Sequence, residues 1–354
     1  MPQVRLQERS ELRHGQTRMI RTRNLARRAK YCVSFYAPIV LLVVSVVAAK
    51  DRSARVNLFP RLQGGQTLAY QISYHSDKHI KTESRVTAAV PDDSVRIDVD
   101  ALLRLEVLSV QAQGDRAIIH VRARFEVLNS DPHFKVPNIE PPAAQLQRED
   151  TDGKSIAFTI LPDGRLDQVS GLDAFLPEQQ QAWQEWASRF LLGAGFRASG
   201  VHISQKWNSE EAEKSPSPLA GLRWMRESTY VRDEPCRAVQ LTVQGSIAQS
   251  DAQPETCAVI LTTAALKQNS DKNPTPEDFK LHELRTVGTA HGTNRMITYI
   301  SVRTGLVIRA TEEATQQMNV TVAKADGSNR VRYDVNAKSH SEVLLVSETP
   351  LNNP

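Results

Sequence analysis

The sequence predicts a mainly β protein with one prominent α-helix, in which a long curved antiparallel sheet follows an N-terminal transmembrane helix. Three observations lead to this prediction. Apolar and polar residues alternate over much of residues 50–346, which is the pattern of half-buried strands. One stretch, 177–192, has the period of an amphipathic helix. An unbroken apolar run, 31–49, precedes both and is long enough to cross a bilayer.

The apolar run 31–49 predicts where the rest of the chain lies. It follows the basic stretch 27–30, and positively charged flanks stay on the cytoplasmic side of a membrane. We therefore expect residues 1–30 to form a cytoplasmic tail and the residues after 49 to be exported from a single-pass anchor in the inner (cytoplasmic) membrane. Small residues before Lys50 also fit signal peptidase, so secretion after cleavage near Ala49 is the alternative. The long basic region favours the retained anchor because it exceeds an ordinary signal-peptide n-region.

Positive charge is concentrated in the N-terminal tail. Residues 1–30 hold nine Lys and Arg against two Glu, whereas residues 51–354 hold 34 basic and 38 acidic residues, a net charge of −4. The net charge of +4 for the whole chain therefore comes from the tail. Positive charge at this place is typical of a segment that fixes membrane topology and is attracted to anionic lipids. No aromatic or helical context surrounds these charges, so nucleic acid is not an expected partner.

Strand patterns fill the first part of the exported region. Alternating segments lie at 66–74, 95–99, 103–110, 117–127 and 155–161. The first places four apolar side chains on one face: Leu68, Tyr70, Ile72 and Tyr74. Residues 75–79, which are polar, are predicted to be a strand end or turn. The proline-rich stretch 131–150 is predicted to be a connector, which allows a boundary between two β domains at 130–151.

The predicted helix at 177–192 carries an aromatic stripe. Pro177 suits its first turn and Gly193 its end. Trp183, Trp186 and Phe190 follow the spacing of one helix face, so they form either a core stripe against the sheet or a ligand-facing surface.

The C-terminal third is the most regular part of the sequence. Strand-like segments at 296–302, 306–324 and 330–346 are joined by short turns, which predicts a meander, and 347–354 form a tail. Segments 209–218 and 268–278, rich in polar residues and proline, are predicted to be loops. Long antiparallel strands without a closing repeat form either a half-barrel or a twisted sandwich.

Two cysteines lie beyond the apolar run. Residues 236–243 and 257–263 both have strand character, and a turn-rich segment separates them. Such a hairpin would place Cys236 opposite Cys257, and an oxidising compartment would close the disulfide. The spacing lacks C-x-x-C and nearby metal ligands, which argues against a redox or metal pair.

Three motifs and the striped helix resemble exported or membrane-anchored bacterial β-rich proteins of unknown function. The motifs are GGQTLAY at 64–70, LPDGRLDQVSG at 161–171 and TGLVIRA at 304–310. The resemblance covers most of residues 56–346. It implies an envelope protein with a curved sheet, and it supplies no catalytic residues.

Residues typical of catalysis or metal binding are scattered. His75, Asp77 and His79 lie close in sequence, but three ligands in a turn without supporting residues are predicted to be surface side chains. Asp98 and Asp100 alternate with apolar residues and are predicted to face solvent. The sequence has no nucleophile elbow, phosphate loop or dinucleotide fingerprint. We therefore predict no catalytic, cofactor-binding or metal-binding site.

Two classes of function remain. The absence of a local catalytic signature favours a non-catalytic envelope β module that binds an apolar ligand, a lipid or an envelope protein. The alternative is an extracytoplasmic hydrolase whose site is assembled from scattered residues. An apolar cavity on the sheet would support binding, whereas converging His, Asp and Ser side chains would support catalysis.

Overall fold

The computed structural model describes residues 55–84, 93–113, 116–135, 153–162, 166–174, 200–213, 217–241, 247–249, 253–269 and 274–346. The chain divides into two compact units, Met1–Arg52 and Ser53–Pro354, and the described residues all belong to the second. The predicted membrane anchor (31–49) and the predicted helix with Trp183, Trp186 and Phe190 lie outside these ranges. Among the described residues, no helix has the length and apolar character needed to span a bilayer.

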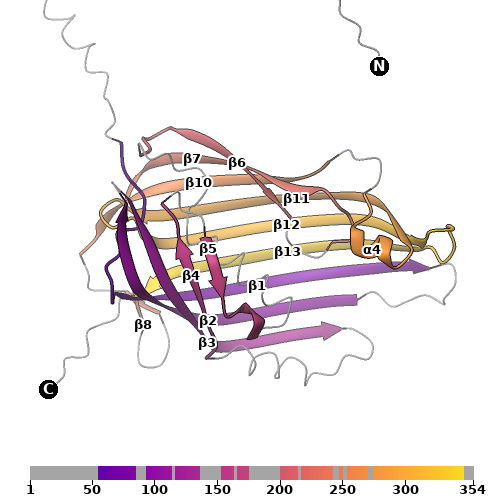
Figure 1. The fold of residues 1–354 in the computed structure, drawn as a ribbon, viewed down its shortest axis with the longest axis horizontal. Coiled ribbons are helices and arrows are strands. Elements are labelled where there is room, and N and C mark those ends of the chain that lie inside the picture. Colours follow the sequence, from indigo (N-terminus) through magenta and orange to yellow (C-terminus); the bar gives the residue numbers. More distant parts are fainter. Residues whose placement is uncertain are drawn as a thin grey trace, which may run out of the picture. The chain divides into compact units, whose positions relative to one another are not determined.

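The described residues confirm a mainly β protein (Figure 1). The strands are β1 (Thr67–Ser84), β2 (Asp93–Gln113), β3 (Arg116–Lys135), β4 (Ser155–Ile160), β5 (Leu166–Ser170), β6 (Lys206–Ala212), β7 (Leu222–Cys236), β8 (Val239–Leu241), β9 (Ile247–Gln249), β10 (Glu255–Gln268), β11 (Leu284–Ser301), β12 (Val307–Lys324) and β13 (Val331–Val346). The helical elements of these ranges are short: η1 (Leu172–Ala174) and α4 (Glu277–Leu281).

These strands form one open sheet with the order β5-β4-β3-β2-β1-β13-β12-β11-β10-β7-β6. Each neighbouring pair in this order is antiparallel, and the predicted C-terminal meander is confirmed as β11, β12 and β13. The first and last long strands, β1 and β13, pair from Ala69 with Val346 to Ser84 with Val331. This pairing joins an N-terminal meander to a C-terminal one in a single sheet.

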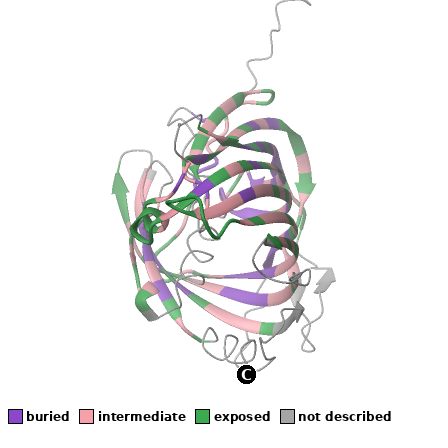
Figure 2. Ribbon diagram, turned by 90° about the vertical axis from the view of Figure 1, so that its right-hand side faces the viewer, coloured by how far each residue is buried: buried purple, intermediate pink, exposed green. Residues whose placement is uncertain are grey.

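The sheet is curved, as Figure 2 shows. In β2 the register with β3 shifts between Asp100 and Ala101 and again between Val107 and Ser109. Bulges of this kind bend a strand and increase its twist. In Figure 1, β4 and β5 accordingly run across β1 and β13, while β4 pairs with the first part of β3.

The largest apolar cluster lies where the sheet folds over itself. Side chains of β2, β3 and β4 pack there against β1 and β13, and its buried members include Leu103, Ile119, Ile156, Ile72 and Val343. Three smaller clusters cover other parts of the sheet, and two of them lie against its long C-terminal strands. In one, Leu58 and Val201 pack with Tyr230, Ile260 and Ile300 of the strands, and in the other Leu219 packs with Leu266 and Val320.

Three segments predicted as turns, loops or connectors are strands instead. Residues 75–79 lie inside β1, because both edges of β1 are hydrogen-bonded there, to β2 and β13. Residues 209–212 belong to β6, which pairs with β7. Residues 131–135 complete β3 and include Pro132. β4 covers β3 only from Ile119 to Arg124, so proline, which lacks an N–H, is tolerated at the uncovered edge.

The structure contains a disulfide between Cys236 and Cys257, whose Cα atoms are 5.8 Å apart. The hairpin predicted around it is wrong. Cys257 of β10 pairs with Glu234, so β10 lies beside the residues that precede Cys236 and not beside those that follow it. β10 pairs along its whole length with β7. The chain between these two strands forms the short antiparallel pair β8–β9.

Candidate functional site

Strand register defines an inner face of the curved sheet. Ile72 of the largest cluster is opposite Val343, which is opposite Ala310, and the row continues to Thr298 and Ile260. Directly paired residues point to the same side of a sheet, and so do residues two apart along one strand. The inner face is therefore the side that carries the largest apolar cluster, and it can be followed along each long strand by alternate residues.

A small apolar cavity lies in this largest cluster. It has a volume of about 40 Å³ and is lined by β1, β2, β3 and β4 side chains, among them Tyr70, Leu103 and Phe158, and by residues 305–307. Burial raises the pKa of the Tyr70 phenol well above its usual range, since the apolar surroundings disfavour the phenolate. The cavity therefore favours apolar groups.

Farther along the strands, the same face carries a set of partly buried apolar side chains. We call this set the distal apolar patch: Tyr74 and Ile80 of β1, Val95, Ile97 and Val99 of β2, Met318 and Val322 of β12, and Val331, Tyr333 and Val335 of β13. Tyr333 and Met318 touch the cluster around Val320, whereas the β2 members belong to no buried cluster of the described residues. Partly exposed apolar side chains grouped in this way are typical of binding surfaces.

The cavity and the distal apolar patch are continuous. Tyr70 and Leu103 of the cavity wall are opposite each other, and the next inner-face pair is Ile72 with Ala101. The pair after that, Tyr74 with Val99, belongs to the patch. From Leu103 to Val95 a strand extends about 26 Å. One apolar track therefore runs along the inner face from the cavity to the distal apolar patch.

The inner face also carries polar groups on strands farther from β1 and β2. The buried carboxylate of Glu312 accepts hydrogen bonds from the Asn294 amide and, at 3.4 Å, from the Ser341 hydroxyl. Arg226 of β7 pairs with Glu211 of β6 at 3.1 Å. These contacts pair charges within the protein and make part of the inner face polar.

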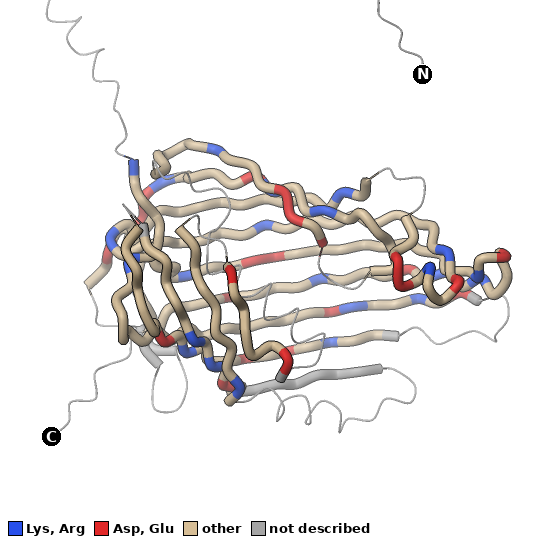
Figure 3. Tube along the Cα trace, viewed as in Figure 1, with Lys and Arg blue, Asp and Glu red and all other residues tan. Residues whose placement is uncertain are grey.

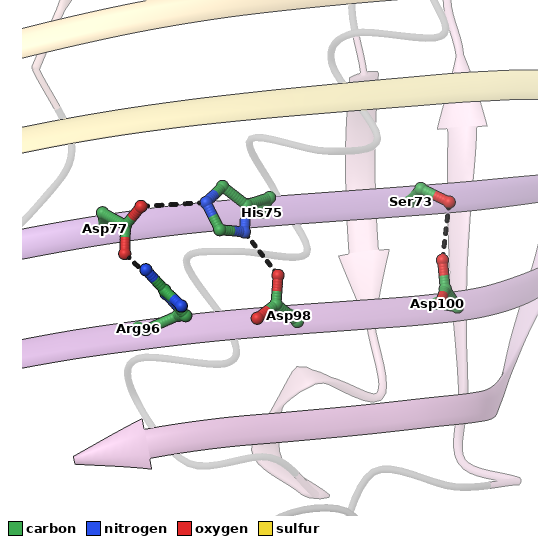
Figure 4. Close-up of polar contacts among 6 residues, drawn as sticks. All are labelled: Ser73, His75, Asp77, Arg96, Asp98 and Asp100. Atoms are coloured by element: carbon green, nitrogen blue, oxygen red, sulfur yellow. Dashed lines mark hydrogen bonds and ion pairs between the residues drawn. The ribbon is translucent and has the colours of Figure 1, made fainter.

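The outer face carries the histidine and aspartates noted in the sequence (Figure 4). Nδ1 of His75 contacts a carboxylate oxygen of Asp98, and its Nε2 lies 2.9 Å from Asp77, which also accepts a 2.9 Å bond from Arg96. Ser73 donates instead to Asp100, at 2.6 Å. Ser73 and His75 thus have separate carboxylate partners, and the arrangement is an exposed ion-pair network and not a serine–histidine pair.

Charges of both signs are interspersed along the sheet (Figure 3). Ion pairs on neighbouring strands include Arg309 with Glu342 at 2.7 Å and Lys206 with Glu227 at 2.8 Å. Within the described ranges, no group of three or more His, Cys, Asp or Glu side chains could hold a metal ion. The prediction that Asp98 and Asp100 lie on the polar side of their strand is confirmed by their pairing with His75 and Ser73.

The His75 network gives a testable pH dependence. Hydrogen bonds first to Asp98 and then to Asp77 raise the pKa of His75, while Arg96 and then His75 lower the pKa of Asp77. A raised histidine pKa adds stability below the unfolded-state pKa, and this stability is lost as the pH rises through the folded-state pKa. We expect Asp98→Asn to lower the pKa of His75, measured by NMR titration of its ring proton. Asp100→Asn is the matched control, and an equal shift in both variants would contradict the assignment.

The sequence predicted that some residues of the inner face pack together, but it did not predict the distal apolar patch. Leu68, Tyr70 and Ile72 pack together as their alternation indicates. The alternation of 95–99 and 331–335 was also visible, but their proximity depends on β1 lying between β2 and β13, which no local pattern encodes. The stripe of Trp183, Trp186 and Phe190 lies outside the described residues.

No protein-family model matches the sequence, and no curated protein matches it. Solved structures give weak similarities. A protein of Parabacteroides distasonis described as a lipoprotein has a TM-score of 0.24 at 9% identity, covering 82% of this chain and 97% of its own. A protein of Bacteroides fragilis described as exported has a TM-score of 0.22 at 9% identity, covering 83% and 100%. An outer membrane channel of Pseudomonas putida has a TM-score of 0.17 at 11% identity, covering 81% and 97%.

Proposed function

We propose that the protein is a non-catalytic β module, held at the inner membrane by residues 31–49, that binds the acyl chain of a lipid along its inner face. The observation that carries this proposal is the apolar track from the cavity beside Leu103 to the distal apolar patch. Burial of apolar surface is favourable by about 25 cal/mol for each Å² removed from water. The partly exposed Val and Ile side chains of the patch therefore favour contact with an apolar ligand.

The shape of the track supports a chain-like ligand. The cavity of about 40 Å³ is too small for a drug-sized molecule, for which pockets of roughly 300 Å³ and more are usual. A flexible chain can place its end in such a cavity and its length along the β2 side chains. The membrane anchor predicted from the sequence would hold the sheet close to a source of such chains.

The hydrolase alternative has no observation of comparable weight in its favour. Buried polar groups on the inner face of the described strands include Glu312 with Asn294 and Ser341, and Ser228 with Thr262, and neither set contains a histidine. Histidines of the long strands, such as His75 and His340, are opposite each other on the outer face. We therefore keep binding as the proposed function.

The proposal is tested with a photoactivatable, clickable fatty acid fed to cells that express the full chain. After irradiation we expect labelled peptides from β1, β2 and β13 as well as from 31–49. Ile97→Glu should reduce labelling of the strands at least tenfold, because it places a carboxylate on the inner face. Thr289→Glu, on the opposite face and exposed, is the matched control. Labelling confined to 31–49 in the unaltered chain would overturn the proposal.

A further inference from the structure

We propose that a group of hydrogen-bond donors on the inner face binds the phosphate of a membrane phospholipid whose acyl chain lies along the apolar track. This inference rests on the proposed function and deepens it, because it names the headgroup chemistry of the ligand. We call these side chains the donor set: Ser76 and Lys78 of β1, Gln316 of β12 and Ser339 of β13.

Strand register places the donor set around one small residue, Ala337 of β13. Lys78 is opposite Ala337, and Ala337 is opposite Gln316. Ser76 is opposite Ser339, which lies two positions after Ala337 on the same strand. With strands about 4.8 Å apart and about 3.4 Å per residue along a strand, all four Cα atoms lie within roughly 8 Å of that of Ala337. Because an alanine side chain ends at Cβ, the donors can converge on a group bound above it.

The cation of the donor set lies among apolar neighbours. Lys78 is exposed, and the residues opposite it are Val95 of β2 and Ala337 of β13. The next inner-face residue along β1 is Ile80. Within the described ranges, the side chains of the donor set form no hydrogen bond or ion pair. A lysine ammonium is a compact point charge and a common phosphate ligand, so this position favours an anionic group.

Other charged side chains of the described inner face have different surroundings. Arg226 pairs with Glu211 at 3.1 Å, and the carboxylate of Glu312 accepts hydrogen bonds from its neighbours. Lys324 is opposite Leu284 at the last position of β12. Of these cations and Lys78, only Lys78 lies on β1 or β2, the strands whose side chains form the track.

The length of the track fits a phospholipid. The stretch of β2 from Leu103, at the cavity, to Val95, opposite Lys78, extends about 26 Å. The four-carbon stem of lysine allows the ammonium to lie several Å nearer the cavity than the Cα atom. One bilayer leaflet is about 20 Å deep with its headgroups, of which the acyl chains occupy about 15 Å. A phospholipid with a chain end at the cavity therefore places its phosphate near the Lys78 ammonium, whereas the carboxylate of a fatty acid lies nearer the cavity.

Two photoactivatable lipids test the inference on the full chain in detergent. Phosphatidylglycerol and diacylglycerol are prepared with the same acyl chains, which carry a diazirine near the methyl end and an alkyne for detection. We expect phosphatidylglycerol to label peptides of β2 and β4, which line the cavity, at least tenfold more than diacylglycerol, because only phosphatidylglycerol carries a phosphate.

A lysine variant tests the assigned cation. Lys78→Met keeps an apolar stem and removes the charge, so it should lower phosphatidylglycerol labelling at least fivefold and leave diacylglycerol labelling unchanged. Lys78→Arg, which keeps the charge, should retain at least half of the phosphatidylglycerol labelling. Lys81→Met is the matched control, because Lys81 is exposed on the opposite face of the same strand, and it should label like the unaltered chain.

The outcomes separate this inference from the proposed function. Equal strand labelling by the two lipids in the unaltered chain would overturn the inference and still support acyl-chain binding. Equal losses in Lys78→Met and Lys81→Met would also overturn it. If unlabelled fatty acid displaces the phosphatidylglycerol probe as well as unlabelled phosphatidylglycerol does, the phosphate assignment is wrong. Absence of strand labelling with both lipids would sink the proposed function together with the inference.

Discussion

Replacing Leu103 by alanine is expected to lower the free energy of unfolding by about 2–5 kcal/mol. The Leu103 side chain is fully buried, at 0% exposure, in the largest apolar cluster, where β2 turns over the inner face. The loss combines the transfer free energy of the removed methyl groups with the cost of the cavity left behind. Since a small cavity already adjoins Leu103, the new space should merge with it and collapse little.

The measurement is urea unfolding of the full chain, followed by tryptophan fluorescence, to which Trp207 of β6 and Trp224 of β7 contribute. A lower midpoint with an unchanged m value indicates a loss of stability. Leu108→Ala is a matched control on the same strand, because Leu108 is 41% exposed, and it should change the free energy by less than about 0.5 kcal/mol. Equal losses in both variants would contradict the assigned burial.

Removing the disulfide is expected to lower stability by about 3 kcal/mol. The bond links β7 to β10 over a sequence separation of 21 residues, and the segment that it closes contains the small β8–β9 pair. Opening the bond gives the unfolded chain more conformational freedom. In addition, Cys257 is fully buried, so its replacement also disturbs packing.

The double variant Cys236→Ser/Cys257→Ser is compared with the unaltered chain before and after reduction by tris(2-carboxyethyl)phosphine. Reduction should lower the unfolding midpoint of the unaltered chain toward that of the double variant, which should not respond. Cys32→Ser removes the remaining cysteine and should leave the midpoint unchanged. Two freely alkylated thiols in protein isolated from the cell envelope would refute the bond.

Local periodicity predicted the strands well where one face is buried. The alternation around Tyr70 and Ile72 identified both the strand and its buried side. It failed from His75 to His79, because polar side chains on both faces resemble a turn when only local contrast is considered. Those residues are a strand because β2 and β13 hydrogen-bond to both edges of β1, and the backbone pairing does not depend on side-chain polarity.

Long-range pairing was beyond what the residues themselves encode. The pattern at 257–263 correctly indicated a strand, but its partner is β7 and not the segment after Cys236. Likewise, no spacing in the sequence shows that Val95 and Val335 lie on the same face with β1 between them. Local alternation predicted that the individual side chains of the candidate site would be apolar positions on strands. Only the strand order shows that these positions lie together on one face.

The pairing of β1 with β13 has a consequence for how the protein reaches its folded state. Tyr70 pairs with Leu345, so the two meanders cannot join until the last strand is available. Contacts between residues so far apart in sequence slow folding, because a long loop must close before they form. During the proposed export β1 would leave the translocation machinery before β13, so the edge of β1 that pairs with β13 would stay exposed until β13 follows. Since unpaired edges promote aggregation, shielding of β1 during export would be as important to this protein as the stability of the finished sheet.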